Sequence, residues 1–155
     1  MMNLRFSQAL PEDARLLTEI AQLSKGHWQY PLHWIEAWLP QLTVTAEFIS
    51  KHPTVRAHIE TQTIGFYALS QTEPTSDLIH FWLLPGFIGR GFGRVMFLDA
   101  VARARAGGVT TLRIESDPHA EGFYRCMGCI RVASSFSTLH GQQRELPVLQ
   151  YSTGR

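Results

Sequence analysis

A glycine-rich segment in the second half of the chain has the composition of an anion-binding loop. It reads Gly86-Phe87-Ile88-Gly89-Arg90-Gly91-Phe92-Gly93-Arg94, and it lies between a strongly apolar run and a long helical pattern. Glycine lets the backbone approach a ligand closely and expose its N–H groups. The start of a helix adds a positive partial charge, so backbone donors and helix dipole would act together on a pyrophosphate.

The spacing of these glycines excludes two common nucleotide-binding motifs. A Walker loop requires Gly-Lys followed by Ser or Thr, and that triplet does not occur in this segment. A dinucleotide loop has the spacing G-x-G-x-x-G and follows the first strand of its fold. Here Gly89, Gly91 and Gly93 have the spacing G-x-G-x-G, and more than half of the chain precedes them. The segment therefore predicts a different phosphate-bearing ligand.

Three side chains near this segment could carry acid–base chemistry. Tyr124 has a phenol that is neutral at pH 7 and can donate a proton. His80 lies on the predicted strand before the glycines, and the unperturbed pKa of a histidine would let it titrate near neutrality. Glu115 ends the next predicted strand. Each also has a structural interpretation: Tyr124 as a core tyrosine, His80 as a buried histidine with its hydrogen bonds satisfied, and Glu115 as a solvated or ion-paired carboxylate.

The glycine segment and a later one resemble, in order, the two coenzyme A motifs of the GNAT superfamily of N-acetyltransferases. Gly91 and Gly93 match the small positions of the first motif, and Ile88 stands where that motif has Arg or Gln. The second match runs from Asp117 to Gly128, with Asp117 in the usual Asn position and with Ala120, Phe123, Tyr124 and Gly128 in register. Together with the N-terminal helices, the resemblance covers essentially the whole chain. The stretch after Asp117 and a closing strand, Arg144-Glu145-Leu146-Pro147-Val148-Leu149, resemble those of small bacterial-type GNAT proteins.

This resemblance implies that the chain moves an acetyl group from acetyl-CoA to an amine, which attacks the thioester directly. Tyr124 would lie near the sulfur as the acid, and His80 or Glu115 would act as base through water. Leu83 and Leu84 would pair through their backbones with the pantetheine arm, and Asp117 would also lie at the cofactor site. The pyrophosphate would contact the residues Ile88, Gly89, Arg90, Gly91, Phe92, Gly93 and Arg94.

The acceptor side is expected to be aromatic. In GNAT-like folds the first helices flank the acceptor, which makes Trp28, Tyr30, Trp34 and Glu36 candidate substrate contacts. Trp82, on the predicted strand before the glycine segment, is a further candidate. Trp34 and Trp38 are four residues apart and share a helix face, and such a pair is more often core than pocket. Trp28 and Tyr30 precede that helix in an expected loop and are the better pocket candidates. An aromatic wall with a single acid, Glu36, suits a small molecule that is a compact cation or an aromatic amine.

Two non-catalytic interpretations remain open, because Ile88 and Asp117 depart from the GNAT pattern. The chain could be an acyl-CoA-binding sensor on a GNAT scaffold. It could also be a subunit whose aromatic patch docks another protein. Turnover of acetyl-CoA with an amine separates an enzyme from both.

Composition narrows the class of protein further. The 155 residues suit a single domain over 1–155, and 14 Lys plus Arg balance 13 Asp plus Glu, which argues against nucleic acid binding by a basic face. The first ten residues hold no long apolar run, so we expect a cytoplasmic protein that does not bind membranes, as a monomer or a homodimer. Cys126 and Cys129 lack a second ligand pair, and we expect two buried thiols and no metal.

Hydrophobic periodicity predicts alternating helices and strands, and the resemblance implies an α/β GNAT fold. We expect a mixed, mostly antiparallel central sheet of about six to seven strands flanked by about four helices. Pro40 should stop a helix that Pro31 opens, and Gly107-Gly108 should end a helix over 92–106 whose apolar face includes Val95, Met96 and Leu98. Strands are predicted over 55–60, 64–70, 78–84, 110–115, 129–138 and 145–151.

Overall fold

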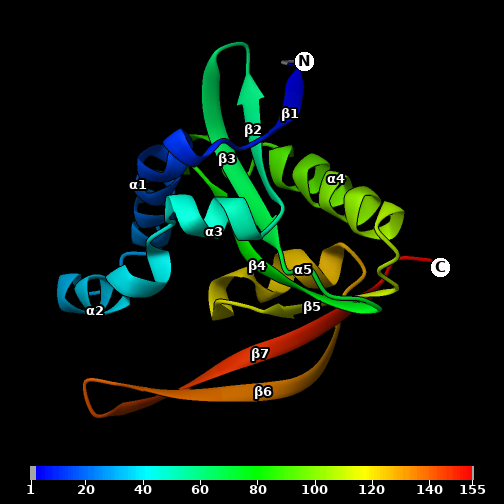
Figure 1. The fold of residues 1–155 in the computed structure, drawn as a ribbon. Coiled ribbons are helices and arrows are strands. Elements are labelled where there is room, and N and C mark those ends of the chain that lie inside the picture. Colours follow the sequence, from blue (N-terminus) through cyan, green and yellow to red (C-terminus); the bar gives the residue numbers. More distant parts are fainter. Residues whose placement is uncertain (1–2, 155) are drawn as a thin grey trace.

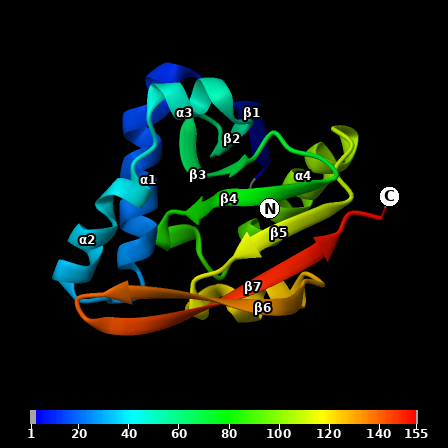
Figure 2. The same cartoon turned by 60° about the horizontal axis from the view of Figure 1, so that its bottom comes forward.

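A seven-stranded sheet runs through the molecule in the order β1-β2-β3-β4-β5-β7-β6, as Figures 1 and 2 show. The structure is a computed structural model that describes residues 3–154. Neighbouring strands are antiparallel except β4 and β5, which are parallel. The predicted mixed, mostly antiparallel sheet is therefore confirmed. The strands are β1 (Leu4–Gln8), β2 (Thr54–Ile59), β3 (Gln62–Leu69), β4 (Thr75–Leu83), β5 (Thr111–Glu115), β6 (Ile130–Leu139) and β7 (Gln142–Ser152).

Five α-helices accompany the sheet within the described residues, one more than expected. They are α1 (Ala14–Gly26), α2 (Leu32–Leu42), α3 (Ala46–Lys51), α4 (Phe92–Ala106) and α5 (Glu121–Cys126), with short 3₁₀ turns at Pro11–Asp13, Pro85–Phe87 and Pro118–Ala120. Pro40 does not stop α2, which continues to Leu42, because a proline near a helix end loses few hydrogen bonds. None of the helices described is long and apolar enough to cross a lipid bilayer.

The sheet buries a separate apolar core on each face. One core packs α4 and α5 against the sheet, and the other packs α1 and α3 against Phe66. Figure 1 shows α1 and α3 on one side of β3 and α4 on the other. Helix α4 buries Phe92, Met96, Phe97, Ala100 and Ala104. The expected apolar face of this helix was wrong for Val95 and Leu98, which are 42% and 47% exposed, since the sheet covers a different stripe of the helix.

Strands β4 and β5 part after a short paired stretch. Their register covers only Thr75 with Thr111, Ser76 with Leu112 and Asp77 with Arg113. Next, the β3–β4 register shifts: Leu69 faces Leu78 and Ala68 faces His80, so Ile79 is an extra residue in β4. A bulge of this kind bends its strand and increases the local twist. Beyond it, β4 diverges from β5 and stays with β3 (Figure 2).

Gly65 lets β3 and β4 pair closely beside this opening. It faces Leu83, and a Cβ atom at Gly65 would lie 2.5 Å from the backbone oxygen of Trp82 and 2.8 Å from Cδ2 of Leu83. Neither distance is possible for a real side chain, so any larger residue would push β4 away from β3.

His80 is part of the core and not of the solvent-exposed surface. Its ring lies 5.3 Å from that of Phe48 and 5.6 Å from that of Phe66, and the residue is 7% exposed. The indole Nε1–H of Trp82 donates to Nδ1 of His80 over 3.0 Å. Burial, with a further contribution from nearby His52, lowers the pKa of His80 to about 4. The ring is therefore neutral at pH 7 and accepts a hydrogen bond.

The substitution Gly65→Ala should lower the free energy of unfolding by about 1–3 kcal/mol, the usual cost of overpacking. Chemical denaturation measures this change. Gly26→Ala is the matched control, because a Cβ atom at Gly26 would meet nothing within 4 Å. Equal stabilities of the two variants would contradict the steric account of Gly65.

The folded chain should lose stability as the pH falls from about 6.5 toward 4. The pKa of His80 is about 4 in the fold against 6.5 ordinarily, so the unfolded chain binds the proton more tightly. The stabilisation is fully present above pH 6.5 and amounts to roughly 3 kcal/mol at most. Denaturation between pH 7 and pH 4 should show a flatter profile for His80→Gln. The exposed His27, changed to Gln, should keep the parent slope, and equal slopes in both variants would exclude His80 as the source.

Candidate functional site

A cavity of about 510 Å³ lies where β4 and β5 have parted. Both strands, the start of α4, helix α5, the 3₁₀ turn at Pro118–Ala120 and the end of α1 contribute to its wall. Residues from both faces of the sheet therefore line the cavity, because it lies between the separated ends of β4 and β5. Eleven of the predicted site residues line it: Trp28, Trp82, Leu83, Ile88, Gly89, Gly91, Gly93, Arg94, Glu115, Asp117 and Tyr124. The others, Tyr30, Trp34, Glu36, His80, Leu84, Arg90 and Phe92, are not in the lining.

The glycine loop forms one end of this cavity. Gly89 and Gly91 have φ angles of +78° and +87°, which favour glycine, and Gly91 is the N-cap of α4. The first N–H groups of an α-helix have no partner inside the helix, so those of α4 are available to a ligand. Gly93 follows in the first turn, where a Cβ atom would lie 3.2 Å from the ring of Phe123.

Two predicted loop residues turn away from the cavity. Arg90 donates to the backbone oxygen of Gly86 over 3.2 Å, and its guanidinium lies over the rings of Phe87 and Phe92 at 5.3 and 5.4 Å. Phe92 is buried in the core of the α4 face. The contacts of Arg90 and Phe92 stabilise the conformation of the loop. Arg94, by contrast, lines the cavity.

Tyr124 lies deep in the wall between the glycine loop and β5. It belongs to α5 and is 6% exposed. Burial raises the pKa of its phenol, with smaller contributions from Cys129 and Asp117 and none from a hydrogen bond. The hydroxyl therefore stays protonated at neutral pH and can donate to a group in the cavity.

The nearby cysteines form no metal centre with other side chains. Cys129 is buried, and burial raises its thiol pKa to about 11, whereas Cys126 is exposed at the end of α5. The expectation of two buried thiols was therefore wrong for Cys126. Residues 3–154 hold no cluster of three or more His, Cys, Asp or Glu side chains that could bind a metal.

Asp117 ties the end of α1 to the turn after β5. Its carboxylate accepts from Lys25 Nζ over 2.6 Å, from the Tyr30 hydroxyl over 2.8 Å and from the His119 backbone N–H over 2.8 Å. Burial raises the pKa of Asp117, but Lys25 and the hydrogen bonds outweigh it, so the net pKa is lowered. Burial also lowers the pKa of Lys25 more than Asp117 raises it. The carboxylate is thus ionised and already saturated by protein donors.

The aromatic side chains of α2 pack around cations of the protein itself. Lys25 Nζ lies 4.2 Å from the ring centroid of Trp38, and the guanidinium carbon of Arg144 lies 4.9 Å from the same ring. Arg144 is also 5.6 Å from the ring centroid of Trp34 and 5.3 Å from that of Tyr30. These rings are already occupied, so they are not the open acceptor wall that the sequence suggested. Glu36 is exposed and outside the cavity.

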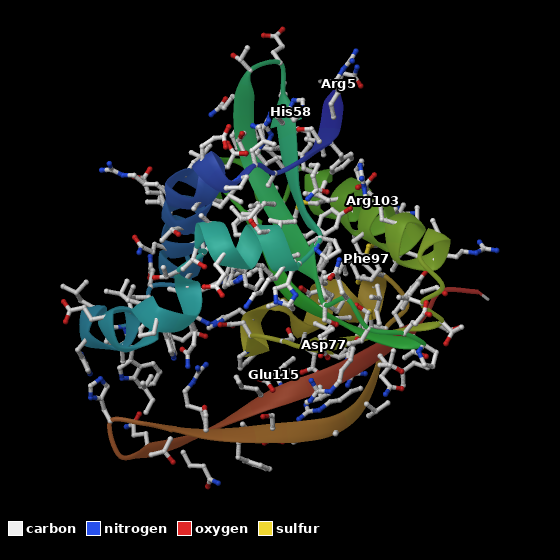
Figure 3. All side chains as sticks on the ribbon, in the orientation of Figure 1. Arg5, His58, Asp77, Phe97, Arg103 and Glu115 are labelled. Atoms are coloured by element: carbon white, nitrogen blue, oxygen red, sulfur yellow. The ribbon has the colours of Figure 1, made fainter. Side chains whose placement is uncertain are left out.

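Glu115 differs from Asp117 in that its carboxylate is exposed and forms no ion pair with a side chain of the described residues. It is exposed at the end of β5 and lines the cavity. No Lys, Arg or His nitrogen within residues 3–154 lies within 4.0 Å of it, in contrast to Asp117. Figure 3 labels Glu115 together with Asp77, which lies where β4 and β5 are still paired and forms an ion pair with Arg113. Parting of the strands therefore leaves Glu115 accessible to a ligand.

Sequence reasoning missed three residues around the site: Lys25, His119 and Arg144. His119 lies inside the second motif and Arg144 opens the closing strand, but nothing in the local pattern links them to Asp117 or Tyr30. Arg144 Nη2 donates to the Tyr30 hydroxyl over 3.3 Å although 114 residues separate the two. Only the pairing of β7 within the sheet brings them together.

Comparison with known proteins identifies the same architecture. A search of curated proteins finds no relative with significant sequence similarity. A GCN5-related N-acetyltransferase from Rhodopseudomonas palustris superposes with a TM-score of 0.78 at 23% identity, over 98% of this chain and 96% of that one. PaiA N-acetyltransferase from Thermoplasma acidophilum, solved with coenzyme A, gives 0.78 at 18% identity, over 97% and 99%. YncA from Salmonella typhimurium, solved with its cofactor acetyl-CoA, gives 0.71 at 16% identity, over 97% and 94%.

These structural likenesses concern the fold, because all three identities are low. The sequence itself adds a direct match to the model of the acetyltransferase (GNAT) family over residues 16–129. That range contains the glycine loop, the parting strands and Tyr124, which together form the cavity. The chain therefore belongs to the acetyltransferase (GNAT) family.

Proposed function

We propose that this protein transfers the acetyl group of acetyl-CoA to the amine of a small molecule. The observation that carries the proposal is the cavity between the parted strands, which has free backbone donors at one end and an unpaired carboxylate toward the other. Its volume of about 510 Å³ suits a cofactor arm and a compact acceptor. Membership of the GNAT family and relatives solved with coenzyme A or acetyl-CoA support the same assignment.

The residues present fit a coenzyme A ester. Backbone N–H groups between Ile88 and Arg94, with the N-terminal dipole of α4, would hold the pyrophosphate. Beyond the bulge, the edge of β4 is no longer paired with β5, so backbone groups of Leu83 would pair with the pantetheine arm. Leu84 is left out of this role, because its N–H donates to the backbone oxygen of Ile64 and its backbone oxygen accepts from Phe87. When bound, the thioester supplies an activated acetyl group, and the remaining chemistry falls to the protein.

Glu115 and Tyr124 are suited to the two proton transfers of the reaction. An amine must lose its proton before it can attack, and the accessible carboxylate of Glu115 can accept that proton directly or through water. A bond then forms between the amine nitrogen and the acetyl carbon as the carbon–sulfur bond breaks. Tyr124, whose phenol stays protonated, can donate its proton to the departing sulfur and recover one from solvent.

His80 has no part in this mechanism. Its side chain is buried against Phe48 and Phe66, outside the cavity, and its Nδ1 already accepts from Trp82. Of the two candidate bases that the sequence suggested, His80 and Glu115, we therefore propose Glu115.

Acetyl-CoA should raise the melting temperature of the protein, because a ligand that binds only the folded state stabilises it. At a hundredfold excess over the dissociation constant, the gain is about 2.7 kcal/mol. Gly93→Val should abolish the shift, since the new side chain would meet Phe123 and Leu83 beside the loop. Gly86→Val is the matched control, because a Cβ atom there would meet nothing within 4 Å. No shift at millimolar acetyl-CoA would exclude the proposed cofactor.

Tyr124→Phe should leave acetyl-CoA binding intact while turnover falls by about ten- to a thousandfold, because the ring is kept and the proton donor is lost. Steady-state kinetics with single-turnover measurements would separate the chemical step from product release. Tyr151→Phe is the control, since Tyr151 packs on Phe97 and does not line the cavity. If both variants turn over like the parent while chemistry limits the rate, Tyr124 is not the acid. A protein that binds acetyl-CoA but acetylates no amine would instead be a sensor.

A further inference from the structure

The end of the cavity nearest α1 differs in chemistry from the glycine end. Ser24, Trp28 and Trp82 line it, together with Glu115, Asp117 and His119 from the end of β5 and the turn that follows. Trp82 packs with the core of the α1 face, whereas Leu83, its neighbour in β4, belongs to the core of the α4 face. A molecule entering from the α1 side would therefore meet these side chains before it reached the thioester.

The charge available at this end is negative. Glu115 and Asp117 are the acidic residues of the lining, but Lys25, Tyr30 and His119 saturate Asp117. Lys25 does not line the cavity, and its ammonium is already bound to Asp117. Glu115 thus remains as a carboxylate that can form an ion pair with an incoming ammonium group.

The walls of this end are aromatic and held in place. The ring of Trp28 stacks face to face on that of His119, with centroids 5.0 Å apart and planes 8° apart, so each ring limits the movement of the other. The indole N–H of Trp82 donates a hydrogen bond to His80, which lies outside the cavity, and this bond fixes the orientation of the Trp82 ring. Because that N–H is already used, the part of Trp82 that faces the cavity offers carbon and not a donor. By contrast, the rings of Tyr30, Trp34 and Trp38 are covered by Lys25 and Arg144.

We infer that the acceptor is a primary amine carried on an aromatic ring system by a short linker. Glu115 binds its ammonium group and then takes its proton, while Trp28, His119 and Trp82 contact the ring. Flat rings pack against fixed aromatic side chains in stacked or edge-on geometry, which saturated chains cannot do as well. His80 acts in this arrangement as a positioning residue for Trp82. This inference rests on the proposed acetyl transfer.

A panel of four amines tests the acceptor class. 2-Phenylethylamine should give a kcat/KM at least about tenfold above that of 2-cyclohexylethylamine, which matches its size without the aromatic ring. Spermidine and a lysine-containing peptide should be poorer still, because a single carboxylate faces several positive charges. A higher kcat/KM for spermidine or the peptide would overturn the aromatic class while leaving acetyl transfer intact.

Substitutions test which side chains cause the preference for an aromatic amine. Trp82→Leu should lower kcat/KM for 2-phenylethylamine by about tenfold and change that for 2-cyclohexylethylamine less than threefold, so that the preference is lost. His80→Leu should partly reduce the preference for 2-phenylethylamine over 2-cyclohexylethylamine, because the indole of Trp82 loses its hydrogen-bond acceptor. His80→Gln, whose side-chain oxygen can still accept from the indole, should keep the preference of the parent. Phe136 is an exposed aromatic residue on β6 that does not line the cavity, so Phe136→Leu should behave like the parent. An unchanged preference in Trp82→Leu would remove Trp82 from the acceptor site.

Binding gives a readout that does not need turnover. Calorimetric titration of 2-phenylethylamine into the protein saturated with coenzyme A should show binding that Trp82→Leu and Glu115→Gln both weaken. Binding with this pattern but no acetyl transfer would refute the proposed activity and keep the amine site. Transfer without any aromatic preference would refute the acceptor class and keep the activity. Absence of both binding and preference would overturn the inference.

Discussion

The parting of β4 from β5 is the constraint on which the rest of the site depends. Two parallel strands that stayed paired would fill the space between them with ladder hydrogen bonds and leave no room for a ligand. Here the ladder ends at Asp77 and Arg113, and the extra residue Ile79 forms a bulge in β4, which stays paired with β3. Gly65 lets the two strands approach closely at Leu83, so β4 remains anchored on one edge while its other edge is open. The cavity, the accessible Glu115 and the buried Tyr124 all follow from this geometry.

A network around Asp117 closes the site on the side of the N-terminal helices. Lys25 at the end of α1, Tyr30 before α2 and His119 in the turn after β5 all bind the same carboxylate. Partly buried ion pairs of this kind add little net stability by themselves, since desolvation offsets the attraction. Their value here is positional, because they fix Trp28 and His119 against one another. Arg144 extends the network to β7 through Tyr30.

The two histidines near the cavity therefore serve different purposes. His119 lies on its wall and stacks on Trp28, whereas His80 lies behind the wall and holds Trp82. A histidine buried among phenylalanines is kept neutral, so it can accept a hydrogen bond but is poorly placed to exchange protons with a ligand. In the mechanism that we propose, Glu115 and Tyr124 carry the proton transfers, whereas His80 and Asp117 hold other side chains in position.

The sequence by itself determined the local features of this protein. The span of α4, the glycine turn before it and the order of the two motifs depend on glycine's freedom, apolar periodicity and the helix dipole, which act over a few residues. Tertiary structure decided which side chains meet, because such contacts join segments far apart in the chain, as Lys25 and Asp117 show at a separation of 92 residues. It also decided which side of α4 is buried, where Val95 and Leu98 were expected inside. His80 and Glu115 could not be ranked as bases from sequence, since burial on one face of β4 and exposure at the parted end of β5 exist only once the sheet has formed.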